Sequence, residues 1–180
     1  MADKKRTIFQ DLNSALFYGF DKNVQQQQKT VHSYTIKNDK PFTIIMIDVD
    51  NFKNYNDNYG HGRGDICLFQ IATALKKVLD PESDSFVARY GGEEFVIVLP
   101  EMGSIEVYDL AQNLCQTIME LGIMHEFSNE ASIVTISVGV ASIINSNDAT
   151  GVSYLDLLQR ADEALYKAKT TGRNKVVIYQ

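Results

Sequence analysis

Apolar positions along the chain fall into two kinds of spacing. Continuous apolar runs rich in β-branched residues predict strands, whereas apolar residues three or four positions apart predict helices. The runs predict strands over 42–49, 86–90, 95–99, 132–142 and 176–179. The helical spacings predict helices over 9–20, 65–78, 110–121 and 155–168. The segment 51–64, which is rich in Asn, Gly and Asp, is predicted to be a loop.

The order of these elements predicts the fold class. It contains a β-α-β-β-α-β core, with an extra N-terminal helix in front and a C-terminal helix and strand behind. This order is typical of the ferredoxin-like (polymerase-palm-like) α+β fold, an antiparallel sheet with helices on one face. Residues 1–40 are interpreted as a helical lead-in to the same domain, and 41–180 as its main body. In this fold the first strand and the central hairpin are neighbours in the sheet.

The composition narrows the classes of function. A chain of 180 residues that is 44% hydrophobic suits one globular domain with a core. A net charge of −6 argues against a nucleic acid polymer as partner. No apolar run approaches the ~18 residues of a membrane span, and the N-terminus makes a poor signal peptide. Cys67 and Cys115 lie in helical apolar patterns, which predicts two reduced core thiols in a cytoplasmic protein.

Acidic residues follow the first strand and the tip of the hairpin. Asp48 and Asp50 end the first strand and share one of its faces, and Glu93 and Glu94 follow the glycines of the hairpin turn. Like charges at a strand end repel one another, and a hard divalent cation removes that cost. The pattern therefore predicts a Mg²⁺ site. The plainer alternatives are loop capping by Asp48 and Asp50, and a tight turn with solvated glutamates.

Four stretches carry a family resemblance. They are IDVDNFKNYNDNYGHGRGD (47–65), ARYGGEEFVIVLP (88–100), TISVGVAS (135–142) and RADEALYKAKTTGRNKV (160–176). In order and spacing they resemble the GGDEF domain of bacterial diguanylate cyclases, from about residue 42 to the end of the chain. The resemblance implies a nucleotidyltransferase that condenses two GTP molecules into cyclic di-GMP and two pyrophosphates. It further implies a dependence on Mg²⁺ (or Mn²⁺) and a transient homodimer of domains.

The resemblance also assigns the metal ligands. Asp48 would bind through its carboxylate, Val49 through its backbone carbonyl, and Glu93 and Glu94 through their side chains. Glu93 would in addition accept the proton of the attacking 3′-hydroxyl. Asp50 receives no catalytic role, because holding the loop after the strand accounts for it.

Substrate contacts follow from the same resemblance. Lys53 would lie at the phosphates and stabilise the charge of the transition state. Asn56 and Asp65 would read the guanine edge, since guanine offers adjacent N–H donors that an ionised aspartate accepts. His61 would lie near the same pocket. The residues expected to reach the triphosphate from the end of the chain are Lys169 and Arg173.

Plainer roles stand beside three of these assignments. Asp65 is also expected to cap the helix that begins there. His61 is as often structural in such a turn. Lys169 would be favourable near a helix C-terminus whether or not it binds phosphate. Arg89, just before the signature, is expected to be a structural ion-pair partner.

Two rival functions remain at this point. The opening motif that the family usually carries is degenerate in DLNSALFYG (11–19). This favours, weakly, a catalytically inactive GGDEF domain that acts as a GTP sensor or a protein-interaction module. The second rival is an enzyme with altered base choice that makes cyclic GMP-AMP, against which Asp65 argues. Most domains of this family are driven by a domain placed in front, whereas about forty residues precede the first strand here. Two interpretations stay open: a catalytic domain excised from a longer protein, with an upstream regulatory domain or partner, or a stand-alone form.

Overall fold

The computed structural model describes residues 39–129, 131–144 and 152–180. The helix predicted over 9–20 and the degenerate opening motif lie outside these residues. The described elements are β1 (Phe42–Val49), α3 (Phe52–Tyr59), α4 (His61–Val78), β2 (Phe86–Gly91), β3 (Glu94–Pro100), α5 (Ser104–Glu120), β4 (Ile136–Ile143), α6 (Tyr154–Thr170) and β5 (Val176–Ile178).

The strands form one five-stranded sheet in the order β2-β3-β1-β4-β5. β1 lies at its centre and pairs antiparallel with β3 and β4, while β2 and β3 form the predicted hairpin. The ferredoxin-like α+β prediction is therefore confirmed. One detail differs, because β5 pairs parallel with β4, so that the sheet is mixed and not wholly antiparallel.

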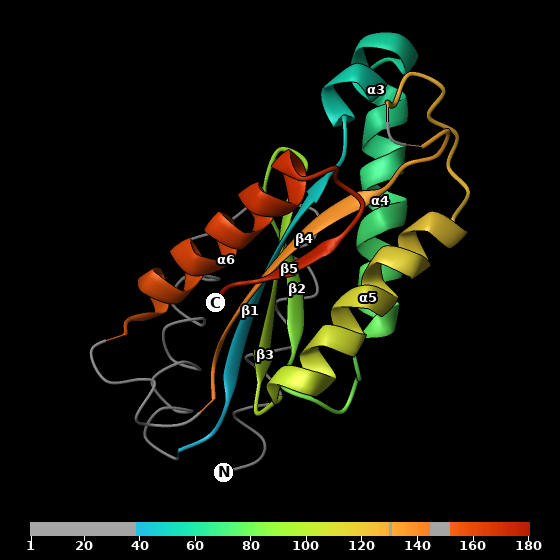
Figure 1. The fold of residues 1–180 in the computed structure, drawn as a ribbon. Helices are drawn as coiled ribbons and strands as arrows, with labels where there is room; N and C mark the ends of the chain where they lie inside the picture. The colour runs from blue at the N-terminus through green and yellow to red at the C-terminus, as the bar shows by residue number, and fades with distance from the viewer. Residues whose placement is uncertain (1–38, 130, 145–151) are drawn as a thin grey trace.

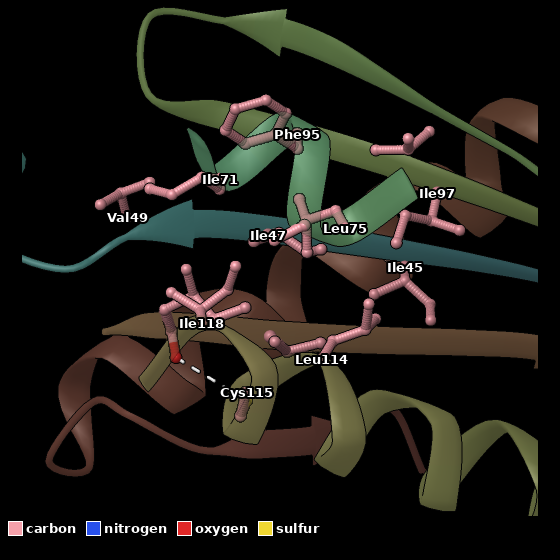
Figure 2. Close-up of a cluster of buried hydrophobic side chains, with 14 of the residues drawn as sticks. Ile45, Ile47, Val49, Ile71, Leu75, Phe95, Ile97, Leu114, Cys115 and Ile118 are labelled. Carbon is pink, nitrogen blue, oxygen red and sulfur yellow. Dashed lines mark hydrogen bonds between the residues drawn. The ribbon is translucent and has the colours of Figure 1, made fainter. Parts of the chain in front are cut away.

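Helices cover both faces of the sheet (Figure 1). Alternate residues of β1 point to opposite faces. Ile45, Ile47 and Val49 pack in one core with side chains of α4 and α5 (Figure 2). Phe42, Ile44 and Met46, on the other face, contribute to a second core with α6. The expectation of helices on one face holds for α4 and α5 but is wrong for α6, which closes the face that the β-α-β-β-α-β core leaves open.

The packing of α6 against the sheet is close. A Cβ built on Gly139 of β4 would lie 2.2 Å from the backbone oxygen of Ala161 and 2.2 Å from the backbone nitrogen of Leu165. Only glycine permits this approach. The contact fixes α6, and with it the residues near its C-terminal end, relative to the centre of the sheet.

The segment 51–64 is not a loop, contrary to prediction. It contains α3 and the first turn of α4, with Gly60 between them at φ +83°. The helix escaped notice because only Phe52 and Tyr55 of its eight residues are buried, which is too few to show a helical period. Asp65 consequently lies inside α4, which begins at His61, so its expected role as a helix cap is wrong.

The two cysteines behave as the sequence predicts. Cys67 and Cys115 are buried and form no disulfide. Burial raises the pKa of each thiol to about 12. Among the described residues, no helix combines the length and the apolar character needed to span a bilayer.

Candidate active site

The acidic pairs predicted to converge do lie together in the backbone. Asp48 and Glu94 are directly opposite each other in the antiparallel pairing of β1 with β3. Glu93 occupies the preceding turn, and its carbonyl oxygen accepts a hydrogen bond from the backbone N–H of Val49 at 3.3 Å. The four predicted metal-binding residues therefore lie at the same end of the sheet, on β1, on β3 and in the turn before β3.

These carboxylates lie in an environment that disfavours their charge. Asp48 is 6% exposed, and burial raises its pKa. The neighbouring charges of Glu93 and Asp50 act in the same direction. Burial also raises the pKa of Glu94, with the charge of Asp48 as the next cause. Burial and neighbouring acids thus disfavour negative charge on Asp48 and Glu94 at the end of β1.

A lysine side chain of α6 contacts Asp48 in this group of carboxylates. Lys169, in the last turn of α6, places its Nζ 2.9 Å from Oδ2 of Asp48. Its hydrogen bond and charge lower the pKa of Asp48 but do not outweigh burial. Lys169 is therefore more than a solvated residue at a helix end. The structure puts it beside a predicted metal ligand, which is where an anionic substrate and its counter-ion would meet.

The donor set fits a hard divalent cation. Within the described residues, no three His, Cys, Asp or Glu side chains gather tightly enough to hold a metal by themselves. Magnesium, however, usually takes one or two carboxylates and completes its shell with water and substrate phosphates. Asp48, Glu93 and Glu94 offer only oxygen, as does the carbonyl of Val49. A bound cation would offset the burial and the mutual repulsion of these carboxylates.

Asp50 has entirely different surroundings, although it lies only two residues from Asp48. It is 1% exposed. The hydroxyls of Thr135 and Ser137 donate to its two carboxylate oxygens at 2.7 and 2.6 Å, and the backbone N–H of Asn174 donates at 3.1 Å. This agrees with the structural role that the sequence suggested. The partners themselves were not foreseen, and the only signal for them was the alternation of Thr135 and Ser137 along a predicted strand.

The predicted base-binding residues lie on α3 and α4. Asn56 has a buried side-chain oxygen, Oδ1, for which the described residues provide no hydrogen-bond donor. A Cβ built on Gly64 would lie 1.9 Å from that oxygen, so glycine keeps the space beside it open. Asp65 is exposed on α4. An unsatisfied buried acceptor near an exposed carboxylate suits a ligand that brings N–H donors.

Three of the other predicted residues lie on α3, at the start of α4 and after α6. Lys53 is exposed on α3, and His61 is the exposed first residue of α4. Arg173 follows α6 in a left-handed conformation, with φ 55°. The side chain of Arg89 donates from Nε to the carbonyl oxygen of Gly92 at 2.7 Å. Arg89 thus has a structural role as expected, although its partner there is a carbonyl of the signature turn and not a carboxylate.

Comparisons with known proteins agree with this geometry. The profile of the family described as "Diguanylate cyclase, GGDEF domain" matches residues 19–175. The chain is 36% identical over 151 residues to Diguanylate cyclase A of Treponema denticola, which covers 82% of this chain and 38% of that protein. It is likewise 36% identical over 141 residues to a diguanylate cyclase of Vibrio cholerae, covering 78% of this chain and 41% of that protein. The chain thus spans about two fifths of the length of these curated relatives.

Solved structures of related domains are also similar to this chain. The active GGEEF domain of a diguanylate cyclase from Vibrio cholerae superimposes with a TM-score of 0.73 and 32% identity, covering 86% of this chain and 93% of that one. The GGDEF domain of DgcB from Caulobacter crescentus in complex with c-di-GMP gives 0.76 and 28%, covering 88% and 89%. Diguanylate cyclase SiaD from Pseudomonas aeruginosa, in complex with its activator SiaC, gives 0.76 and 27%, covering 98% and 68%. With a family profile that covers residues 19–175, the chain belongs to the GGDEF family of diguanylate cyclases.

Proposed function

We propose that residues 41–180 form the catalytic domain of a diguanylate cyclase that condenses two GTP molecules into cyclic di-GMP and two pyrophosphates. The observation that carries the proposal is the convergence of Asp48, Glu93 and Glu94 at one end of the sheet, with Lys169 2.9 Å from Asp48. The chain's relatives named diguanylate cyclases support it. The proposal includes a cytoplasmic location, since two buried free thiols suit a reducing compartment.

The proposed metal site uses the oxygens of Asp48, Val49, Glu93 and Glu94. Bound Mg²⁺ (or Mn²⁺) would neutralise phosphate charge and lower the pKa of the attacking hydroxyl. The carboxylate of Glu93 is the proposed acceptor for the proton of that 3′-hydroxyl. Its place in the partly exposed turn between β2 and β3 leaves it accessible to a substrate.

The bond changes balance as two identical transfers. The 3′-oxygen of one GTP forms a bond to the α-phosphorus of the other, and the bond from that phosphorus to the pyrophosphate oxygen breaks. Lys53, Lys169 and Arg173 are the proposed counter-charges for the triphosphate. Catalysis of this kind depends mainly on positioning and on electrostatic stabilisation.

Base recognition is assigned to Asn56 and Asp65. Guanine presents N1–H and N2–H₂ as adjacent donors, which the unsatisfied Oδ1 of Asn56 and the carboxylate of Asp65 can accept. Adenine lacks this pair of donors and would leave the acceptors without partners. His61 lies at the start of the same helix and is proposed to border the pocket.

A two-fold homodimer completes the proposal. Each domain offers one nucleotide site, whereas the product contains two equivalent linkages, so two domains must face each other about a two-fold axis. Control of that encounter by an upstream domain or a partner protein is also proposed, because SiaD is found in complex with its activator SiaC. For a transient dimer, specific activity is expected to rise with enzyme concentration.

The decisive experiment is an incubation of the purified chain with GTP and Mg²⁺, followed by chromatography for cyclic di-GMP. A parallel tube contains GTP with ATP, and a third contains GTP with EDTA. Cyclic di-GMP in the first two tubes and none in the third is the expected result. Binding of GTP without any product would instead support the inactive, GTP-sensing alternative, and a mixed GMP-AMP product would support altered base choice.

A further inference from the structure

The turn that follows α6 has an unusual backbone. Gly172, Arg173 and Asn174 have φ angles of 115°, 55° and 44°, so three successive residues lie in the left-handed region. For residues with a Cβ this region is unfavourable, and a run of such residues needs support from its surroundings. The turn bears Arg173, one of the proposed triphosphate ligands.

Hydrogen bonds to the rest of the chain provide that support. The backbone N–H of Arg173 donates to the carbonyl oxygen of Ala168 at 3.0 Å, which closes the end of the helix. The backbone N–H of Asn174 donates to Oδ2 of Asp50 at 3.1 Å. The carbonyl oxygen of Lys175 accepts from the N–H of Val138 at 2.9 Å and leads into β5. The bond to Asp50 is therefore the one that ties the left-handed residues to the end of β1.

Asp50 is well suited to this task. Its carboxylate is buried and accepts from Thr135 and Ser137 at the start of β4 and from Asn174 in the turn after α6. An ionised carboxylate is an acceptor only, and all three of these groups can donate. Hydrogen bonds to a charged acceptor are stronger than those between neutral groups. One buried group thus joins β1, β4 and the turn after α6.

The turn and the metal-binding end of β1 are consequently linked at two neighbouring points. Asp48 contacts Lys169 and Asp50 contacts Asn174, so the two ends of a six-residue segment are fixed on either side of Arg173. In Figure 1 this segment passes beside the end of β1. The placement of Arg173 relative to the carboxylates depends on both contacts.

We propose that Asp50 is a positioning residue for the nucleotide site: by holding the N–H of Asn174 it fixes the left-handed turn and thereby the reach of Arg173 toward the triphosphate. The inference rests on the proposed function, because it takes Arg173 as a phosphate ligand. It adds a residue that touches neither substrate nor metal. Its effect is expected on the binding of phosphates and not on the binding of the base.

The test measures binding, by calorimetry, of a non-hydrolysable GTP analogue and of guanosine to the full chain in the presence of Mg²⁺. Asp50→Ala is expected to weaken binding of the analogue about tenfold and to leave guanosine binding unchanged. Arg173→Ala should give a similar loss. If Asp50 acts through Arg173, the double variant loses no more than either single variant.

Two further variants separate positioning from general damage. Asp50→Asn keeps the volume and one acceptor oxygen for the N–H of Asn174, so it should fold and lose only about threefold, again with no further loss when combined with Arg173→Ala. Thr135→Val removes a hydroxyl that donates to the same carboxylate oxygen but leaves the Asn174 bond in place. It should bind the analogue as the unchanged chain does.

Three outcomes would overturn the inference. Additive losses in the double variants would show that Asp50 does not act through Arg173. Equal losses for guanosine and for the analogue would show general damage to the site. Wild-type affinity in Arg173→Ala would remove the residue on which the positioning acts. Failure of the unchanged chain to bind the analogue at all would, by contrast, contradict the proposed function itself.

Discussion

The end of β1 carries two buried carboxylates with opposite surroundings. Asp50 accepts three hydrogen bonds from the protein, and both of its carboxylate oxygens have a donor. Asp48 forms an ion pair with Lys169 and faces Glu94 across the strand pair. Burial and the neighbouring acids raise the pKa of Asp48. Of two similar residues, the one with three hydrogen bonds from its own chain is suited to maintaining the fold, and the one whose charge is disfavoured is the proposed metal ligand.

The largest effect is expected on catalytic activity, when Glu93 beside Asp48 is changed. Glu93→Gln keeps the shape of the side chain but removes the proposed metal ligand and proton acceptor. Cyclic di-GMP synthesis should fall by at least about 100-fold, with an unchanged circular dichroism spectrum. Glu82→Gln, in the exposed turn before β2, is the matched control and should keep full activity. Near-normal turnover by Glu93→Gln would refute the assignment of the metal site.

Substitution of Asp50 is expected to lower the stability of the fold. Asp50→Ala leaves the hydroxyls of Thr135 and Ser137 and the N–H of Asn174 buried without their acceptor. The free energy of unfolding, measured with urea, should fall by about 3 kcal/mol. Thr135→Val removes one donor and should cost about 1 kcal/mol. A loss in Asp50→Ala no larger than that in Thr135→Val would show that the network is not what holds this end of β1.

The comparison extends to α3 and α4, where the buried Oδ1 of Asn56 has no hydrogen-bond donor among the described residues. Asp65→Ser removes the proposed acceptor for the guanine N–H groups. The preference for GTP over ATP, measured as a ratio of kcat/KM, should fall by about 1–3 kcal/mol in free-energy terms. Asp57→Ser, an exposed change on α3, is the control and should leave the ratio unaltered. An unaltered ratio in Asp65→Ser would remove Asp65 from base recognition.

A smaller effect of opposite sign is expected at Asp48. Asp48→Asn removes a charge that burial and neighbouring acids disfavour, and it keeps an oxygen for Lys169. Without divalent metal the variant should be more stable than the unchanged chain by about 1 kcal/mol, although it should be inactive. Thermal unfolding in EDTA measures the change. A clear loss of stability would mean that the ion pair with Lys169 outweighs the cost of burying Asp48.

The smallest effect concerns the two buried thiols of α4 and α5. The pKa of Cys67 and Cys115 is raised to about 12, so both thiols stay protonated well above neutral pH. Alkylation by iodoacetamide at pH 8 should be far slower than for free cysteine and should increase as the pH rises toward that pKa. Unfolding in urea should restore the normal rate. Rapid labelling of the folded chain at pH 8 would contradict the burial of both thiols.

The sequence by itself determined the strands, their order and the signature turn. Continuous apolar runs mark β1 and the hairpin clearly, because a strand covered on both faces needs apolar residues at every position. The motif spacing was sufficient to identify the family and to place Asp48 on the strand next to the hairpin that carries Glu93 and Glu94. These features depend on local sequence pattern and on a topology with few alternatives, so they can be predicted from the sequence.

Tertiary structure decided the rest. The helix α3 is short and mostly polar, so no local period revealed it, and its presence placed Asp65 within α4 instead of at its start. The parallel pairing of β5 and the position of α6 on the second face follow from packing over the whole sheet. The contacts of Asp50 with Thr135, Ser137 and Asn174 join residues 85 or more positions apart. The role of a carboxylate depends on which donors the folded chain brings close to it. Residue type and spacing along the chain do not show which distant residues become neighbours.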